Sequence, residues 1–164
     1  MRVVVADTGP IHYLILIGHS DILPVLFQNI IIPSVVRNEL LHQEAPILVR
    51  NWMAQPPTWI DVREAPAQRN TDVSMAKLDA GERDVIGLAS LLGADLLLMD
   101  ERRGVMAARN KGFAVTGTLG VLELAAERKH LNLRDVLLQL RDTSFRCRPE
   151  ILDAMLTRHR GEAG

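Results

Sequence analysis

The most constraining feature of this sequence is a short apolar run, Val3-Val4-Val5-Ala6, that stops at Asp7. The run lacks the polar–apolar alternation of a strand with one solvated face, so it predicts a strand that is buried on both faces. Residues 96–99 repeat the pattern and stop at Asp100. Strands of this kind require a sheet with helices packed on both sides.

Segments with the helical spacing of apolar residues alternate with such runs along the chain. Strands are predicted at residues 3–6, 29–33, 59–62, 96–99 and 113–115. Helices are predicted at residues 11–17, from 21, at 34–41, 46–54, 79–92 and 101–110, from 118, and at 133–140 and 149–157. The alternation predicts an α/β fold, a three-layer sandwich around a central, mostly parallel sheet with right-handed crossovers.

Length and composition narrow the class of protein. A chain of 164 residues has the size of one domain, so we expect a single domain over residues 1–164, ending in helices at 132–160. Cys147 is the only cysteine, which excludes an intramolecular disulfide and a thiolate metal cluster. The sequence shows no evident export signal and no membrane-spanning run, so a cytoplasmic location without membrane contact is expected.

The charge of the chain is balanced. The formal net charge is −1, from 19 basic and 20 acidic residues. A general nucleic-acid binder is usually strongly basic. If nucleic acid is the substrate, local basic patches or metal ions must attract it.

Asp7 and Asp100 each follow a predicted buried strand directly. Ligands of open parallel sheets bind at the carboxyl ends of the strands, near a switch in strand order. These two carboxylates are therefore expected to face one crevice. Each aspartate taken alone suits a turn or a helix cap equally well.

Two glutamates extend this acidic set. Glu39 lies at the edge of the apolar stripe of its helix, and Glu82 lies in the first turn of another. Asp79 suits the N-cap of that second helix, with Glu82 as its capping-box partner, which alone would explain Glu82. Four converging carboxylates would repel by several kcal/mol at intermediate dielectric, so they need a cation. An oxygen-only donor set suits Mg²⁺ or Mn²⁺, and His12, His42, His130 and His159 are isolated in the sequence.

Five short segments in series resemble the motifs of a PIN domain. They are Val5-Ala6-Asp7-Thr8-Gly9-Pro10-Ile11, Pro33-Ser34-Val35-Val36-Arg37-Asn38-Glu39-Leu40, Leu78-Asp79-Ala80-Gly81-Glu82, Leu97-Leu98-Met99-Asp100-Glu101-Arg102-Arg103-Gly104 and Val115-Thr116-Gly117-Thr118-Leu119-Gly120-Val121-Leu122. The motif-bearing part covers residues 3–124. It is similar to a prokaryotic PIN-like branch related to VapC-type toxins.

The resemblance implies a PIN-like fold and a Mg²⁺- or Mn²⁺-dependent endoribonuclease. Asp7, Glu39, Glu82 and Asp100 match the acidic positions of the family, as catalytic residues and metal ligands. Thr8 matches the hydroxyl residue that helps to position the site. Asp84 is a fallback for the third acid, and Glu101 is a further candidate beside Asp100.

Substrate-binding residues are predicted around the same edge. Arg102, Arg103 and Thr118, with Thr8, are the candidates for holding RNA. Thr118 also suits the N-cap of its helix, which is the favoured interpretation of that residue. Solvated surface is favoured for Arg109 and Lys111, and for the basic tail. The tail comprises Arg141, Arg146, Arg148, Arg158 and Arg160.

Three functions remain open from the sequence. The first is a ribonuclease acting on RNA, as the toxin of a toxin–antitoxin pair with a small antitoxin protein as partner, or in RNA turnover. The family resemblance also implies a homodimer. The second is a catalytically inactive PIN-fold module that binds RNA or protein. Phosphoryl transfer on an aspartate ranks last, because no lysine ends a predicted strand.

Overall fold

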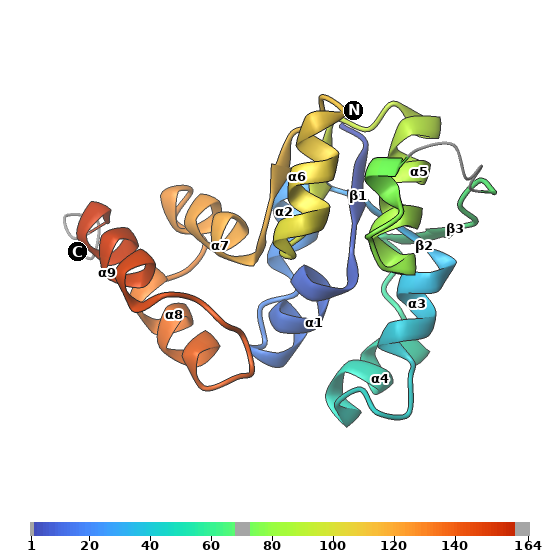
Figure 1. Ribbon diagram of the computed structural model, residues 1–164. Coiled ribbons are helices and arrows are strands. Elements are labelled where there is room, and N and C mark those ends of the chain that lie inside the picture. The colour runs from blue at the N-terminus through green and yellow to red at the C-terminus, as the bar shows by residue number, and fades with distance from the viewer. Residues whose placement is uncertain (1, 68–72, 160–164) are drawn as a thin grey trace.

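The computed structural model describes residues 2–67 and 73–159 and is built on a five-stranded sheet (Figure 1). The strands are β1 (Val4–Ala6), β2 (Ile30–Pro33), β3 (Ile60–Arg63), β4 (Leu96–Leu98) and β5 (Val115–Thr116). They lie in the order β3-β2-β1-β4-β5, and each neighbouring pair is parallel. The predicted α/β fold with a central parallel sheet is confirmed.

Each predicted helix has a counterpart in the structure. The helices are α1 (Thr8–Leu16), α2 (Ile22–Phe27), α3 (Ser34–Leu40), α4 (Ile47–Ala54), α5 (Ala80–Leu92), α6 (Arg102–Asn110), α7 (Thr118–Glu127), α8 (Leu133–Arg141) and α9 (Pro149–Arg158), with a 3₁₀ turn at Val73–Met75. Helix α1 starts earlier than predicted, directly after Asp7, whose side chain accepts a hydrogen bond from the Thr8 amide. The left-handed backbone of Gly18 follows its end.

Helices cover both faces of the sheet. From β1 the chain first moves to β2 and β3, and it then crosses back to β4 and β5. Right-handed connections therefore place α1 and α2 on the face opposite to α5 and α6. In Figure 1, α5 and α6 lie in front of the sheet and α2 lies behind it. Val5, Ile32 and Leu97 on the central strands have no exposed surface, which agrees with this three-layer arrangement.

The reversal of strand order falls between β1 and β4. Asp7 directly follows β1, and Asp100 follows β4 after one further residue. The two strands run in parallel register, and the Asp7 amide donates to the Leu98 carbonyl at 2.8 Å. The switch point of the sheet thus brings both aspartates to the same edge, as the sequence predicted.

The C-terminal helices extend the fold beyond the sheet. Helix α8 packs on α7, and α9 packs on α8. The segment between α8 and α9 runs back toward α1 (Figure 1). There the hydroxyl groups of Tyr13 and Ser144 are 3.1 Å apart. Within the described residues, no helix is long and apolar enough to cross a membrane.

Candidate metal centre

Asp7 and Glu39 lie in a cluster of carboxylates at the first turn of α5. A Cβ atom added at Gly81 would lie 3.0 Å from Glu39 Oε1, 3.1 Å from Asp7 Oδ1 and 3.4 Å from Asp79 Oδ1. Carboxylates from three different parts of the chain therefore approach the backbone of Gly81, and a side chain at that residue would crowd them.

Asp7 is the most perturbed member of this cluster. Its residue is 7% exposed, and burial raises the pKa of its carboxyl from 3.8 to about 7. The negative charges of Asp79, Glu39 and Glu82 also raise this pKa, while the hydrogen bond from the Thr8 amide lowers it. The charged neighbours that act on Asp7 are thus all acidic, and the site favours the arrival of a cation.

Glu39 reaches the cluster from α3. Val36 and Leu40 on the same helix are fully buried, so Glu39 sits at the margin of the core, as its spacing predicted. Its carboxylate accepts a hydrogen bond from the Thr8 hydroxyl. Burial and the charge of Asp79 raise the pKa of Glu39. Thr8, predicted to contact substrate, is placed here to orient Glu39.

Asp79 is the member of the cluster that the sequence did not indicate as a site residue. It forms the predicted capping box with Glu82. The Glu82 amide donates to Asp79 Oδ1 at 2.8 Å, and the Asp79 amide donates to Glu82 Oε2 at 3.1 Å. Its position in the motif beside Glu82 was the available signal, but only the folded chain shows that the capping carboxylate also faces Asp7 and Glu39.

Glu82 lies behind the other acids. It is 5% exposed, and a Cβ added at Gly104 of α6 would lie 3.1 Å from its Cγ. Burial raises the pKa of Glu82, and the charge of Arg103 lowers it. One of its oxygens is already used in the capping box. Glu82 therefore supports the first turn of α5 as well as adding negative charge near Asp7.

Asp100 is held separately, by the start of α7. The Thr118 amide donates to Asp100 Oδ1 and the Thr118 hydroxyl donates to Oδ2, both at 2.7 Å. A Cβ added at Gly9 would lie 3.0 Å from Asp100 Oδ2, so this carboxylate packs against the first turn of α1. The prediction that Thr118 is an N-cap is wrong, because Gly117 takes that position and the Thr118 hydroxyl is directed to Asp100.

Other predicted residues lie further from the cluster. The charged neighbours that shift the pKa of Asp84 are Arg83 and Glu64. Neither residue belongs to the acidic cluster around Asp7. Glu101 is the N-cap residue of α6, and its charge raises the pKa values of Asp100 and Glu82. Arg102 and Arg103 are exposed. Of this pair, Arg103 is the one that acts on an acid of the set.

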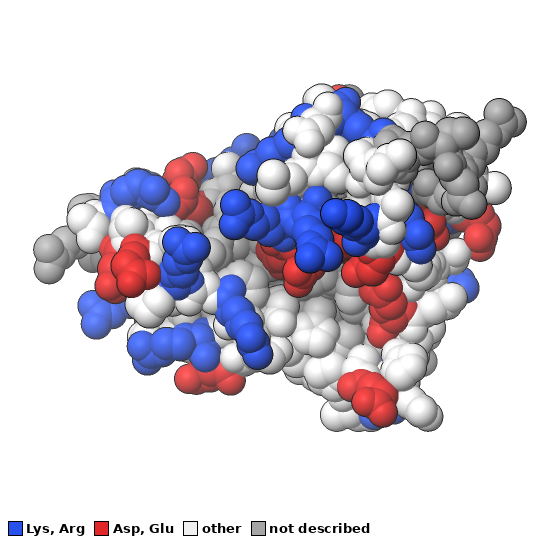
Figure 2. Space-filling model, in the orientation of Figure 1, with Lys and Arg blue, Asp and Glu red and all other residues white. Residues whose placement is uncertain are grey.

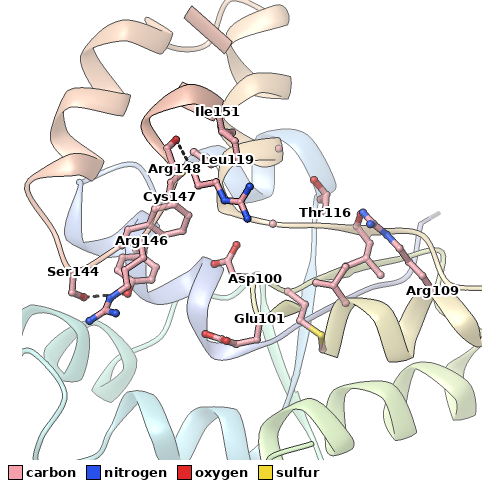
Figure 3. A pocket seen from close by; sticks show the side chains of 17 residues that line it. Asp100, Glu101, Arg109, Thr116, Leu119, Ser144, Arg146, Cys147, Arg148 and Ile151 are labelled. Atoms are coloured by element: carbon pink, nitrogen blue, oxygen red, sulfur yellow. Dashed lines mark hydrogen bonds between the residues drawn. The ribbon is translucent and has the colours of Figure 1, made fainter. Parts of the chain in front are cut away.

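A cavity of about 690 Å³ opens beside Asp100 and Glu101. Arg109, Arg146 and Arg148 line it together with these acids (Figure 3). These arginines are exposed, as the prediction of solvated surface requires, and they also border a cavity next to Asp100. Arg102 and Arg103, the predicted RNA contacts, do not line it.

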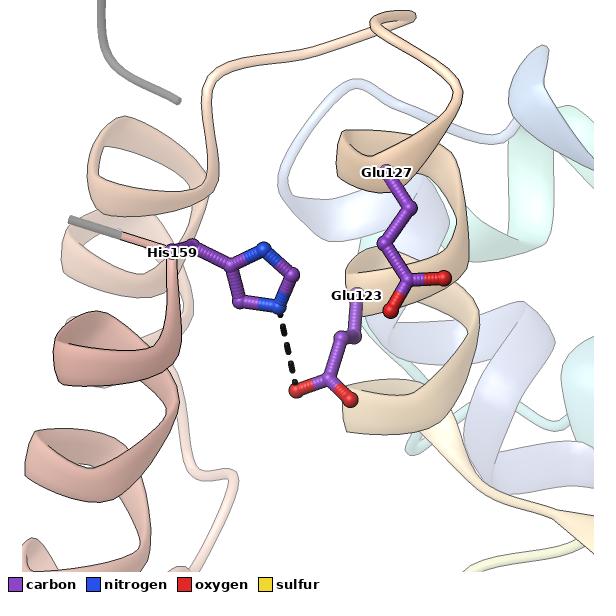
Figure 4. A group of neighbouring side chains, drawn as sticks. All are labelled: Glu123, Glu127 and His159. Carbon is purple, nitrogen blue, oxygen red and sulfur yellow. Dashed lines mark ion pairs between the residues drawn. The ribbon is translucent and has the colours of Figure 1, made fainter. Parts of the chain in front are cut away.

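In residues 2–67 and 73–159, the group of at least three possible metal ligands whose donor atoms lie closest together is found between α7 and α9 and not at the acidic cluster (Figure 4). One donor atom from each of Glu123, Glu127 and His159 lies within 4.8 Å of the others. Glu123 already pairs with Arg158 at 2.7 Å and with His159 Nε2 at 3.5 Å. The sequence showed His159 as isolated, which the fold corrects. These contacts account for the group as a link between the two helices.

The acidic cluster offers the type of donor that a divalent cation binds, although no three of its acids have donor atoms that all lie within 4.8 Å of one another. Carboxylate oxygens of Asp7, Glu39 and Asp79 lie 3.1, 3.0 and 3.4 Å from the place where a Cβ of Gly81 would sit. An all-oxygen set of this kind suits Mg²⁺ or Mn²⁺ better than a soft metal. No ion pair joins these three carboxylates to a lysine or arginine in residues 2–67 and 73–159.

Comparison with known protein families agrees with this geometry. A family model described as a PIN domain matches residues 3–160, which is nearly the whole chain. No match was found among curated proteins. PIN domains are generally nucleases and typically use divalent metal ions. The family model matches almost the full sequence, and the parallel sheet carries acidic residues at its switch point. The chain therefore belongs to the PIN domain family.

Proposed function

We propose that this protein is a Mg²⁺- or Mn²⁺-dependent endoribonuclease that hydrolyses phosphodiester bonds of RNA. The observation that carries the proposal is that the Asp7, Glu39 and Asp79 carboxylates all approach Gly81, with oxygens 3.0 to 3.4 Å from the place of a Cβ there. Asp7 is buried while Glu39 and Asp79 are exposed, and a buried acid that faces other negative charges destabilises a fold unless a cation balances it. In a nuclease that uses a divalent cation, such a cluster would hold the ion.

The residues that would hold the metal are Asp7, Glu39 and Asp79, with Asp100 as the acid at the adjoining strand end. When bound, the ion supplies a water of lowered pKa and neutralises charge on the phosphodiester. Glu82, counted among the ligands from the sequence, would act mainly through the capping box that fixes Asp79.

Neighbouring hydroxyl groups pre-orient these acids. The Thr8 hydroxyl holds Glu39, and the Thr118 hydroxyl and amide hold Asp100. Each carboxylate keeps an acceptor for a further ligand, because an ionised carboxyl group has about four lone-pair positions. Preorganised acids lower the cost of assembling the reactive geometry around a phosphate.

The experiment is a cleavage assay on fluorescent RNA with Mg²⁺ or Mn²⁺. The purified protein is expected to cleave internally, and a chelator is expected to stop the reaction. Asp7→Asn keeps the shape of the side chain but removes its charge, so the rate is expected to fall at least about a hundredfold. Asp153→Asn, on the exposed surface of α9, is the matched control and is expected to retain full activity. Equal cleavage by Asp7→Asn and the unaltered protein would refute the proposal.

We further propose a biological role as the toxin of a toxin–antitoxin pair. The support is the likeness of five motifs, including those around Asp7 and Asp100, to the branch related to VapC-type toxins. Induced expression without a partner is expected to arrest growth, and Asp7→Asn is expected to relieve the arrest. Arrest that persists with Asp7→Asn would exclude RNA cleavage as its cause.

A further inference from the structure

The cavity beside Asp100 joins the acidic edge of the sheet to the C-terminal part of the chain. Its volume is about 690 Å³, within the range of sites that hold small organic groups. One side is formed by Val115, Thr116 and Leu119, and the other by the segment before α9 and by Ile151. A cavity of this size has room for one or a few nucleotides of a single strand.

Around this cavity, the acidic side chains lie in the middle and the basic side chains lie on either side of them. In Figure 3, Asp100 and Glu101 lie between Arg109 on one side and Arg146 and Arg148 on the other. Figure 2 shows basic side chains gathered around acidic ones near the centre of the face that it presents. A phosphate chain entering the cavity would therefore meet guanidinium groups on both sides of the acids.

The guanidinium groups of Arg146 and Arg148 are available for a ligand. Both residues are exposed, and no carboxylate in residues 2–67 and 73–159 forms an ion pair with either of them. Arg109 makes one long contact, 3.4 Å from its Nη2 to the Val115 carbonyl. Arginine binds phosphate oxygens through paired N–H donors, so unpaired guanidinium groups at a cavity suit a phosphodiester.

The segment that carries these two arginines is fixed in position. The Tyr13 and Phe145 rings meet edge to face, with centroids 5.0 Å apart and an interplanar angle of 84°. The Tyr13 hydroxyl also lies 3.1 Å from Ser144 Oγ. At the far end of α9, Arg158 pairs with Glu123 of α7 at 2.7 Å. The segment is thus anchored to α1 on one side, and its helix is anchored to α7 on the other.

We infer that Arg146 and Arg148, together with Arg109, form the phosphate-binding site for single-stranded RNA leading to Asp100. The apolar walls at Leu119 and Ile151 would take a base, and the arginines would take the adjoining phosphates. The inference rests on the proposed ribonuclease function and assigns the C-terminal segment to substrate binding. It moves the main RNA contacts away from Arg102 and Arg103.

The test is RNA binding, measured separately from cleavage. The full chain carrying Asp7→Asn, which is expected to block cleavage, is titrated into short fluorescent single-stranded RNA, and anisotropy is followed over a range of salt concentrations. Arg146→Ala with Arg148→Ala is expected to weaken binding at least about tenfold and to reduce the slope of log affinity against log salt by about 1.4. Arg146→Lys with Arg148→Lys is expected to restore most of the salt slope.

The matched control is Arg134→Ala with Arg141→Ala on α8, which removes the same charge from exposed positions outside the cavity. It is expected to change affinity less than about twofold. If both double variants bind equally well, the inference is overturned, and the cavity is then a candidate site for a protein partner. If the unaltered protein neither binds nor cleaves RNA, the proposed function itself fails. Equal thermal unfolding of all variants excludes misfolding as the cause.

Discussion

Asp7 and Asp100 occupy equivalent places at adjoining strand ends, yet their surroundings differ. Thr118 donates one hydrogen bond to each Asp100 oxygen, at 2.7 Å. Asp7 accepts from the Thr8 amide at 2.8 Å, and it otherwise faces the charges of Asp79, Glu39 and Glu82. Burial raises the pKa of both carboxyls, but at Asp100 the Thr118 donors oppose the rise.

Asp7 and Asp100 therefore illustrate two ways in which the charge of a buried acid can be compensated. At Asp100 the protein itself supplies the compensating donors. At Asp7 the pKa of about 7 shows that the described neighbours leave the charge poorly compensated. We therefore expect the metal to matter most for the Asp7 side of the site. The experiments below test this division in order of expected effect.

The largest effect is expected on the stability of the metal-free protein. Below pH 3.8, Asp7 is protonated in both the folded and unfolded states. As pH rises from 3.8 through about 7, the unfolded chain releases this proton before the folded protein does, so the free energy of unfolding falls. Asp7→Asn removes this loss and is expected to stabilise the metal-free protein above pH 7 by on the order of 4 kcal/mol.

Urea unfolding in chelator at a series of pH values measures this effect. The difference between the unaltered protein and Asp7→Asn is expected to grow from low pH up to about pH 7 and then to level off. A difference that does not depend on pH would show that Asp7 is compensated within the protein, as Asp100 is.

A smaller loss is expected from Thr118→Val. The variant keeps the shape of a buried side chain but leaves Asp100 Oδ2 without the Thr118 hydroxyl. A hydrogen bond to a charged group contributes about 1.5–3 kcal/mol, so unfolding free energy is expected to fall by about 2 kcal/mol. Cleavage is expected to fall as well, and Thr118→Ser is expected to rescue both. Full activity of Thr118→Val would show that Asp100 needs no pre-orientation.

Gly81→Ala tests whether the close approach of the acids to Gly81 matters for activity. The new Cβ would lie 3.0 Å from Glu39 Oε1 and 3.1 Å from Asp7 Oδ1, so it crowds the metal ligands. Alanine favours a helix over glycine by about 1 kcal/mol, so stability is expected to change little. Cleavage is expected to fall about tenfold, or about 1.4 kcal/mol in activation free energy. Unchanged cleavage with unchanged stability would contradict convergence at Gly81.

The smallest effect is expected from Glu82→Gln. Glutamine can replace glutamate in a capping box, so the Asp79 backbone stays held. Cleavage kinetics are expected to change by no more than about threefold if Glu82 acts through the cap. A loss as large as that of Asp7→Asn would place Glu82 among the metal ligands, as the sequence first indicated.

Much of the fold could be predicted because local signals agreed with the tertiary structure. The apolar runs ending at Asp7 and Asp100 became β1 and β4, two of the three interior strands of the sheet. The capping box of Asp79 and Glu82 could also be identified, because it depends only on residues three apart. These features are specified by sequence spacing alone.

The rest of the site depends on contacts between distant segments. Thr118 was assigned to a cap because its bond to Asp100 joins residues 18 apart in the sequence. Arg146 and Arg148 were assigned to solvated surface because only the return of their segment to Tyr13 brings them beside Asp100. Asp79 was predicted only as a helix cap, because its spacing to Glu82 explains that role in full. The sequence shows no sign that the same carboxylate also faces Asp7 and Glu39.

Calorimetric titration with Mn²⁺ tests the central claim most directly, because it asks whether the acids around Gly81 bind a divalent cation. The unaltered protein is expected to bind Mn²⁺, and Asp7→Asn is expected to weaken binding at least about tenfold. Glu123→Gln with Glu127→Gln, which alters the group at α7 and α9, is expected to leave binding unchanged. Binding that survives in Asp7→Asn and disappears in the Glu123 and Glu127 variant would contradict the account.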